Sequence, residues 1–402
     1  MEKYDIIIIG GGISGLFSAY QIQKLCPDKS IMILEKQSFL GGRMDTFNFF
    51  NTTVNIGAGI GRKEKDGILI KLLDELKIDY KEYSIDMKYS DTIHKNDLYS
   101  DIDVTKTISL LKRKYNKKEF TKYTFKRYAK HILGAVTYNL FVIKLGFSDF
   151  EEADAFDVLH YYGLDDNEKG GIGLLIPWSL LIKKISDKIG LNKIKLSCDI
   201  TSLTSCSDYF TVNTSKTIFF ARKVIIASTI DTVCRLLPTF KIYNQIHGQS
   251  FLRVYGKFSK PIPELNVYTI VPGPLKKIIP INSKDGIYMI AYSDNEDAKF
   301  LNKYSKNNAK NRDFYRNLIQ EALGLNVRLE LTAIKAFYWE IGTHYYEPLK
   351  KEYKNRLEFI DQAQHPCKNL LVVGEMTAVH QGWSLGALES VNSVVSFKWL
   401  SS

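Results

Sequence analysis

Residues 4–15 read Tyr-Asp-Ile-Ile-Ile-Ile-Gly-Gly-Gly-Ile-Ser-Gly, and this stretch decides the fold. The run of isoleucines is typical of a strand in a parallel sheet that is covered on both faces. The glycines that follow, Gly10, Gly12 and Gly15, fit the pattern G-x-G-x-x-G, and residues 16–25 carry apolar side chains at helical spacing. A strand, a glycine turn and a helix in this order predict a Rossmann-like α/β unit.

Each glycine of the turn has a physical task in binding a dinucleotide. Gly10 permits the tight turn, Gly12 lets the backbone approach a pyrophosphate, and Gly15 lets the helix pack closely against the strand. The helix begins near Ile13 and Ser14, where free N–H groups and the positive end of the helix dipole favour phosphate. The turn therefore predicts a nucleotide pyrophosphate at the start of this helix.

A second apolar run, residues 31–34, follows the helix and ends at Glu35, twenty residues beyond Gly15. An acid at this place accepts hydrogen bonds from the ribose hydroxyls of a bound dinucleotide. Glu35 and the adjacent Lys36 are therefore predicted to lie at the adenosine end of the ligand.

The residues after this acid identify the kind of dinucleotide. Residues 41–46 read Gly-Gly-Arg-Met-Asp-Thr, and here the sequence resembles the flavin-dependent amine oxidase family, which carries Gly-Gly-Arg-x-x-Thr/Ser at this place. The resemblance implies that Gly42 and Arg43 meet the pyrophosphate or the flavin side of FAD. Arginine supplies a fixed charge and a fork of donors for such a contact. The family also has a glycine-rich turn against the flavin ring, matched here by Gly57, Ala58, Gly59 and Ile60.

The end of the chain carries a second match to the same family. An apolar run over residues 369–373 breaks at a Gly-Glu pair, and residues 381–390 resemble the family's closing Gly-Trp/Tyr-x-x-Gly-Ala-x-Glu-Ser motif. In that family the acid contacts the ribityl or phosphate region, and the next helix points its positive end at the pyridine-dione edge of the flavin. The cofactor-binding residues that this match implies are Gly374, Glu375, Trp383, Ser384, Leu385 and Ala387.

The resemblance implies an α/β fold of the GR2-type flavoproteins, in which a Rossmann-like FAD-binding domain is interleaved with an α+β substrate domain. The expected FAD-binding segments are 1–78, 190–240 and 365–402, and the expected substrate-binding segments are 79–189 and 241–364. Strands of the FAD-binding domain are predicted over 193–200, 209–212 and 224–227. Ile200 lies where the family makes backbone contacts to adenine. We expect noncovalent FAD, with His344 as an ordinary core or surface histidine and not the site of a histidyl linkage.

The family's chemistry implies three catalytic positions. Amine oxidases take a hydride from a carbon next to an amine nitrogen and pass the electrons to O2, which gives hydrogen peroxide. Trp383 is expected as one aromatic wall around the substrate and Tyr345 as the other, with Tyr346 as the alternative to Tyr345. Arg253 occupies the place of a lysine that holds a water against the flavin, unless the strand is shifted by four residues to bring in Lys257. Arginine is bulkier and forked, so it need not hold the same water, and this residue bears on oxygen reactivity.

Three functions fit these motifs. The first is an FAD-dependent amine oxidase. Carboxylates from the acidic block 149–168 would suit a polyamine substrate, whereas Arg62 or Arg253 would suit the carboxylate of an amino acid. The second is a protoporphyrinogen-oxidase-like or desaturase-like flavoenzyme acting on a larger substrate. The third is an FAD-stabilised binding or structural protein with weakened catalysis.

The net charge of +11 over 402 residues comes almost wholly from one segment. Residues 106–130 hold ten Lys or Arg and a single acid, Glu119, and are expected to be helical. The block is either a solvated surface, partly neutralised by the acidic residues 149–168, or a docking patch for an anionic partner such as RNA or phospholipid.

Composition excludes several other classes of protein. The chain is 45% hydrophobic and 12% aromatic, which argues against disorder. Its five cysteines form no CxxC pair, and we expect free thiols and no metal site. No apolar run approaches the length of a membrane-spanning helix, and the first residues lack the pattern of a signal peptide, so a cytoplasmic location is expected.

Overall fold

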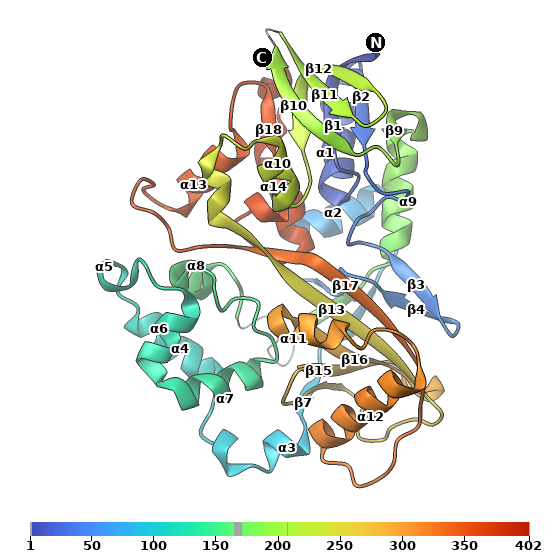
Figure 1. The fold of residues 1–402 in the computed structure, drawn as a ribbon, viewed down its shortest axis with the longest axis vertical. Helices are drawn as coiled ribbons and strands as arrows, with labels where there is room; N and C mark the ends of the chain where they lie inside the picture. The colour runs from blue at the N-terminus through green and yellow to red at the C-terminus, as the bar shows by residue number, and fades with distance from the viewer. Residues whose placement is uncertain (1, 165–170, 207, 402) are drawn as a thin grey trace.

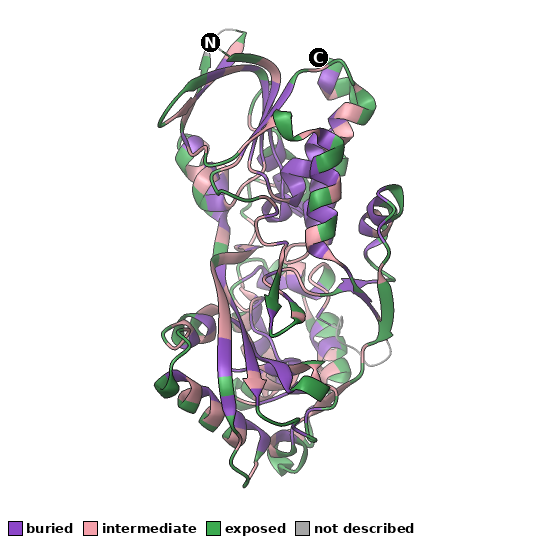
Figure 2. Cartoon of the chain, turned by 90° about the vertical axis from the view of Figure 1, so that its right-hand side faces the viewer, coloured by how far each residue is buried: buried purple, intermediate pink, exposed green. Residues whose placement is uncertain are grey.

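Two sheets form the framework of the protein, and two long strands connect them. The computed structural model describes residues 2–164, 171–206 and 208–401. Strands β13 (Ile246–Phe258) and β17 (Leu331–Tyr346) pair with each other and run from the region of the first sheet into the second (Figure 1). Buried residues fill both regions (Figure 2).

The first sheet has seven strands in the order β10-β11-β12-β1-β2-β9, and β18 pairs with β12. The strand β1 lies parallel to β2 and β12, and β12 lies parallel to β18, so the carboxyl ends of four strands meet at one edge. The strands are β1 (Glu2–Ile9), β2 (Ile31–Leu34), β9 (Ile194–Lys195), β10 (Ile200–Cys206), β11 (Tyr209–Thr214), β12 (Ile218–Ile226) and β18 (Leu370–Val372). The sheet is therefore assembled from three separate stretches of the chain, and we propose these stretches as the core of one domain.

Helices cover both faces of this sheet, which explains the continuous apolar sequence of β1. Ile6 and Ile8 belong to one buried cluster, and Ile7 and Ile9 belong to another on the opposite face. Alternate residues of a strand point to opposite faces, so each isoleucine has a layer of helices to pack against. The first face is covered by α1 (Ile13–Leu25), α2 (Gly67–Glu75), α9 (Trp178–Ile189) and α14 (Ser384–Val394), and the second by α10 (Ile230–Leu236) and α13 (Arg356–Gln364).

The predicted strand over 193–200 is wrong in extent. The chain pairs with β2 only through Ile194 and Lys195, and β10 begins at Ile200. Between them Ser197 has a φ of 52°, and its N–H donates to the carbonyl of Gln37 at 2.8 Å. This left-handed residue turns the chain out of the sheet, so one apolar run becomes two strands.

The second sheet has six strands in the order β17-β13-β16-β15-β14-β7. Its pairs are antiparallel except for β14 with β7. The helices α11 (Asn295–Asn302) and α12 (Ala309–Leu323) pack on one face of it. Its remaining strands are β7 (Met87–Tyr89), β14 (Tyr268–Ile270), β15 (Lys277–Asn282) and β16 (Ile287–Asp294).

Smaller sheets and one further helix complete the fold. A hairpin is formed by β3 and β4, and a three-stranded sheet has the order β5-β8-β6. The strands are β3 (Thr46–Phe49), β4 (Thr52–Asn55), β5 (Gly61–Arg62), β6 (Lys81–Ser84) and β8 (Ile172–Leu175). The further helix is α15 (Phe397–Ser401). None of the helices in the described part of the chain is long and apolar enough to cross a membrane.

The charged blocks lie in a group of short helices with a buried core of its own. The basic residues 106–130 fall on α4, α5 and α6, where Lys106 is 86% exposed, and Lys126 pairs with Glu151 of the acidic block at 3.4 Å. Two other acids of the block, Asp154 and Asp157, form buried ion pairs with Arg356. Residues 165–168 of the block lie outside the described residues. The helices are α3 (Asp91–His94), α4 (Val104–Lys114), α5 (Lys117–Phe120), α6 (Phe125–Leu133), α7 (Ala135–Leu145) and α8 (Ala155–His160).

We predict that Gly15→Ala destabilises the protein, whereas Gly67→Ala does not. A Cβ on Gly15 would lie 1.9 Å from the carbonyl oxygen of Gly10, so helix α1 must move away from the glycine turn. A Cβ on Gly67, in the first turn of α2, would meet no atom within 4 Å. Urea unfolding should show a loss of about 1–3 kcal/mol for the first variant and less than about 0.5 kcal/mol for the second. Equal stability of the two variants would contradict the close packing.

Candidate functional site

The carboxyl edge of the first sheet is the place where the sequence motifs converge. Gly10 has a φ of 111°, and a Cβ there would lie 2.2 Å from the carbonyl oxygen of Ala227, just after β12. Gly374, just after β18, has a φ of 129°. Both values lie in the left-handed region that favours glycine. The turns after three parallel strands are therefore packed directly against one another, as at the ligand-binding edge of open α/β sheets.

Open space remains in front of helix α1. A Cβ on Gly12 would meet no atom within 4 Å, and one on Gly42 would meet only the Cα of Gly12, at 3.8 Å. Gly12 precedes α1 and Trp383 precedes α14, and no side chain caps either helix. The amides of both first turns therefore lack side-chain acceptors, and two positive helix ends are offered to a ligand. These features fit the pyrophosphate and flavin of FAD.

Glu35 holds the glycine turn at the end of β2. Its Oε2 accepts a hydrogen bond from the N–H of Gly11 at 2.6 Å, and its Oε1 accepts one from Gln37 at 2.7 Å. Carboxylate oxygens accept more than one hydrogen bond, so ribose hydroxyls can still be received there. Lys36 is exposed and lies 3.7 Å from Asp199, at the outer rim of this edge.

A buried carboxylate joins the two motifs that lie at opposite ends of the chain. Oε2 of Glu375 lies 3.5 Å from Nη1 of Arg43 and 2.6 Å from Nδ1 of His344. Oε1 of Glu375 accepts hydrogen bonds from the N–H groups of His344 at 3.0 Å and Gly382 at 2.7 Å. Arg43 also donates to the carbonyl of Gly342 at 2.5 Å. The Gly-Gly-Arg motif, the closing motif and strand β17 therefore share one charged centre.

This environment fixes the charge of Glu375. Burial alone would raise its pKa, but His344, Arg43 and the amide of Gly382 lower the pKa to about 2. A carboxylate that receives several donors is held ionised in this way. His344 is almost fully buried, and its Nε2 receives the N–H of Ile230 at 3.3 Å, so both ring nitrogens are engaged by the protein.

The glycine-rich turn 57–60 packs against Arg43 and Arg253. The N–H of Ala58 donates to the carbonyl of Arg43 at 2.9 Å, and a Cβ on Gly57 would lie 2.3 Å from that oxygen. A Cβ on Gly59 would lie 2.5 Å from a guanidinium nitrogen of Arg253. The structure thus brings Arg253 to the turn that was predicted to face the flavin. Lys257, the alternative, instead donates to the carbonyl of Asp285 near the C-terminal end of β13.

The ring of Trp383 is stacked against the guanidinium group of Arg62. The guanidinium carbon of Arg62 lies 3.8 Å from the centre of the Trp383 ring, and Arg62 is buried. Such stacking of arginine on tryptophan is a favourable cation–π contact. The sequence identified Arg62 and Trp383 as candidate residues, but it did not predict their contact. The strand β5, which positions Arg62, has only two residues and so leaves no recognisable pattern in the sequence.

The structure does not bring Tyr345 together with Trp383. Tyr345 packs among the short helices, and its ring lies 5.2 Å from that of His247. Alternate residues of β17 point to opposite sides, and the side of His344 and Tyr346 is the one that meets Glu375 and the carbonyl of Ala378. The role of Tyr345 as the second wall therefore stays a prediction.

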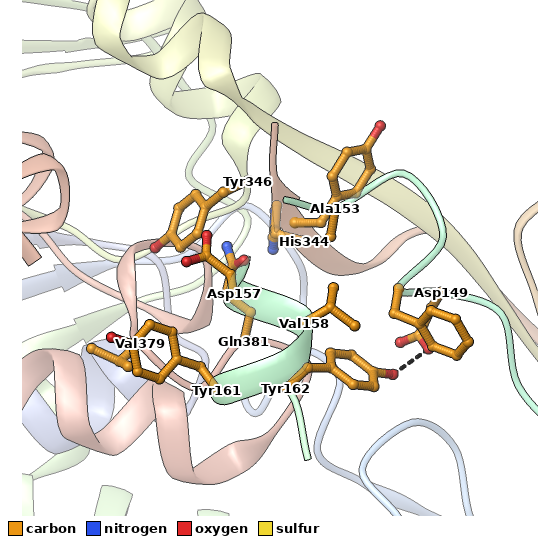
Figure 3. A pocket seen from close by; sticks show the side chains of 12 residues that line it. Asp149, Ala153, Asp157, Val158, Tyr161, Tyr162, His344, Tyr346, Val379 and Gln381 are labelled. Carbon is orange, nitrogen blue, oxygen red and sulfur yellow. Dashed lines mark hydrogen bonds between the residues drawn. The ribbon is translucent and has the colours of Figure 1, made fainter. Parts of the chain in front are cut away.

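A cavity of about 30 Å³ lies beside Tyr345, between α8 and β17 (Figure 3). His344, Asp157 and Tyr162 are among its lining residues, and Tyr162 donates to Asp149 across it. The volume suits one or two water molecules rather than an organic substrate. This cavity, between the short helices and β17, is therefore too small to be a site for an organic substrate.

The remaining predicted residues lie at the same edge of the first sheet. The hydroxyl of Ser14 donates to the carbonyl of Ala387 at 3.3 Å, which ties α1 to α14. Leu385 and Ala387 are buried, and Ser384 begins α14. Ile200 is buried at the start of β10, and its carbonyl already receives the guanidinium of Arg235.

Part of the chain is similar in sequence to known proteins. Residues 8–76 match the NAD(P)-binding Rossmann-like domain family. A segment of 48 residues is 44% identical to the FAD-containing monooxygenase EthA of Mycolicibacterium smegmatis, covering 12% of this chain and 10% of that protein. The chain thus matches about a tenth of the length of its curated relatives.

Solved structures match over nearly the whole chain. Cyclohexylamine oxidase from Brevibacterium oxydans superposes with a TM-score of 0.78 over 99% of both chains, at 15% identity. The chain has the fold of the flavin-dependent amine oxidases. A putative protoporphyrinogen oxidase from Exiguobacterium shares this fold, with a TM-score of 0.72 over 100% of this chain and 99% of that one, at 14% identity. The fold class predicted from sequence is therefore confirmed.

We predict that Glu375→Gln makes stability less dependent on pH in acid. The pKa of Glu375 lies at about 2 in the folded state against an ordinary value of 4.5, so its stabilising effect is complete above pH 4.5 and is lost as pH falls toward 2. At pH 7 the variant should lose about 1–3 kcal/mol, because charged donors keep a weaker acceptor. Urea unfolding of both proteins between pH 3 and 7 measures the difference, and a constant gap across this range would contradict the assignment.

We also predict that Gly12→Ala weakens FAD binding without unfolding the chain. The added methyl would enter the open space before α1, where no protein atom lies within 4 Å. The affinity for FAD, measured by calorimetry on the apoprotein, should fall at least about tenfold, which corresponds to about 1.4 kcal/mol. The apoprotein should unfold at the same urea concentration as the wild type. Unchanged affinity would show that the pyrophosphate lies elsewhere.

Proposed function

We propose that the chain is an FAD-dependent oxidoreductase of the amine oxidase type, which removes a hydride from a carbon next to an amine nitrogen. The observation that carries the proposal is the convergence of the glycine turn, the Arg43–Glu375 pair and the uncapped N-terminus of α14 at one edge of the sheet. Bound FAD would accept the hydride and pass the electrons to O2, which yields hydrogen peroxide.

The protein's own residues would bind the cofactor, orient the substrate and keep water out of the site. The amides of α1 would hold the pyrophosphate, with Arg43 fixed beside it by Glu375. The start of α14 would stabilise negative charge at the flavin edge, as oriented amides do elsewhere. Trp383 and the second sheet would exclude water and position the substrate. FAD would be bound noncovalently, because His344 is buried and both of its nitrogens are engaged.

The structure weighs against a polyamine substrate. A site for several ammonium groups requires free carboxylates, and the acidic block was the expected source. Asp154 and Asp157 pair with Arg356, and Asp149 receives the hydroxyl of Tyr162. These three acids, in the described part of the block, are engaged within the protein, which favours a monofunctional amine or an amino acid as the substrate.

A second candidate function has a specific observation in its favour. Arg62 already covers one face of Trp383, at 3.8 Å, so a buried cation lies where an aromatic wall for a neutral amine was predicted. A larger substrate with acidic groups, as in a protoporphyrinogen-oxidase-like enzyme, would meet this cation favourably. The basic residues 106–130 would serve separately as a surface for an anionic partner.

The test is anaerobic mixing of the purified flavoprotein with monoamines, polyamines, amino acids and protoporphyrinogen. Loss of the flavin absorbance with an amine or amino acid, followed by hydrogen peroxide when air is admitted, is the expected result. Loss only with protoporphyrinogen would establish the second candidate instead. Retention of the absorbance with every compound would overturn both.

We predict that Arg253→Lys accelerates the reaction with O2. Lysine is a compact, strongly hydrated point charge that can hold a water, whereas the forked guanidinium of Arg253 fills the space beside Gly59. The second-order rate of reoxidation by O2, measured by stopped flow, should rise about tenfold. The rate with an artificial acceptor such as ferricyanide serves as the control and should change little. An unchanged rate with O2 would show that Arg253 does not govern oxygen reactivity.

A further inference from the structure

A dense group of cations lies where α4 meets α5, and the proposed chemistry does not use it. This group, the basic junction, consists of the exposed residues Lys112, Arg113, Lys114, Lys117 and Lys118. No acid lies between residues 104 and 118, and within the described parts of the chain no member of the junction forms an ion pair. The helix dipole favours the three cations in the last turn of α4 but disfavours the two that begin α5.

The core of the short helices holds the basic junction in place. The hydroxyl of Tyr128 in α6 donates to the carbonyl of Leu111 at 2.6 Å, and the side chain of Asn116 accepts from the N–H of Lys118 at 3.0 Å. The ring of Tyr115, in the middle of the junction, packs against that of Tyr128, with 5.3 Å between the ring centres. A partner can therefore bind these cations without first ordering the backbone that carries them.

Aromatic rings lie among the cations of this surface. Nζ of Lys117 lies 5.5 Å from the ring centre of Phe156, and the guanidinium carbon of Arg127 lies 4.1 Å from that of Tyr123. Both rings are half-buried, so part of each is open to solvent. Neighbouring ring centres lie 5.3, 6.1 and 5.9 Å apart along the row Tyr123, Phe120, Tyr115 and Phe156. Cations beside open aromatic faces are the combination that binds single-stranded nucleic acid, because phosphates meet the cations and bases stack on the rings.

The same helices offer no apolar face to a membrane. A basic helix that binds a lipid surface buries its apolar side chains between the lipids. Here those side chains are already used, because Ile108 and Leu111 of α4, Phe120 of α5, and Phe125 of α6 are buried in the core of the short helices. None of the large apolar side chains over residues 104–133 is exposed. This surface therefore suits a polyanion in solution better than a lipid surface.

We infer that the basic junction, together with the rings of Tyr123 and Phe156, binds single-stranded nucleic acid. The cations would contact phosphates, which are alike in every strand, so the binding would not depend strongly on sequence. In Figure 1 the helices α4, α5 and α6 lie at the lower left, whereas β1 and α1 lie in the upper part of the molecule. The inference therefore goes beyond the proposed oxidoreductase and does not depend on it.

The test is fluorescence anisotropy of a labelled single-stranded RNA of about 20 nucleotides, titrated with the FAD-loaded protein so that the glycine turn is already occupied. Five phosphate contacts predict that the logarithm of the association constant falls with the logarithm of the salt concentration at a slope of about −3.5. Binding should thus weaken about a hundredfold between about 50 and about 200 mM salt. An abasic strand of the same length, which has the phosphates but no bases, should bind at least about tenfold more weakly.

Charge removal at the basic junction should weaken RNA binding. The variant carries Lys112→Gln, Lys114→Gln and Lys118→Gln, which leave two of the five cations. Its affinity at about 50 mM salt should fall at least about tenfold, and the slope should become about −1.4. The three side chains are exposed, so the urea concentration at half-unfolding should stay at the wild-type value.

A matched control removes the same charge from another surface. It carries Lys303→Gln, Lys306→Gln and Lys310→Gln, which replace three exposed lysines before and at the start of α12. Both variants remove three positive charges from the net +11, so an effect of overall charge would be equal in the two. The control should bind RNA within about twofold of the wild type.

Each other outcome would overturn the inference. Equal loss of affinity in the two variants would show that only the net charge attracts RNA, and an unchanged affinity of the first variant would place the RNA elsewhere. Equal binding of the abasic strand would remove the role of the rings. Tighter binding to phosphatidylserine vesicles, or equal competition by polyglutamate, would assign the surface to a lipid or to an acidic protein. Selective RNA binding by a flavoprotein that no amine reduces would support this surface while refuting amine oxidation.

Discussion

The buried carboxylate of Glu375 is the constraint on which the rest of the site depends. It is held by Arg43 from the N-terminal motif, by His344 from β17 and by Gly382 before α14. No two of these segments are neighbours in the sequence, so the charge of one residue fixes the relative positions of the glycine turn, the closing helix and the strand that enters the second sheet. If Glu375 lost its charge, the groups that donate to it would face a weaker acceptor in a buried site. These donors therefore hold Glu375 in its ionised form.

The same arrangement links the cofactor edge to the substrate side. The strand β17 carries His344 at Glu375 and pairs with β13, which carries Arg253 to the glycine-rich turn beside the first sheet. The ring of Tyr292 is contacted both by the guanidinium group of Arg253 and by the ammonium group of Lys277. The guanidinium group of Arg62 stacks on the ring of Trp383. Buried cations and aromatic rings therefore lie together on the second-sheet side of this arrangement.

The parts of the site that the sequence predicts are those that are local in the chain. The strand, turn and helix of residues 2–25 follow from the isoleucine run and its glycines, because their spacing reflects packing within one unit. Contacts between segments that are distant in the chain leave no pattern in the sequence. Examples are the stacking of Arg62 on Trp383, the hydrogen bond of His344 to Glu375 and the burial of Lys277. Each depends on how distant strands and turns pack together. The motif match likewise places Tyr345 on a strand, whereas the register of β17 decides to which side its ring points.

The most direct measurement of the central claim is a calorimetric titration of the apoprotein with FAD, FMN and NAD in parallel. The account predicts one FAD per chain, with FMN bound at least about a hundredfold more weakly because it lacks the adenosine that Glu35 should receive. NAD should not compete, since the turn 57–60 and the start of α14 are predicted to face a flavin ring. Equal affinity for FMN, or preference for NAD over FAD, would contradict the account.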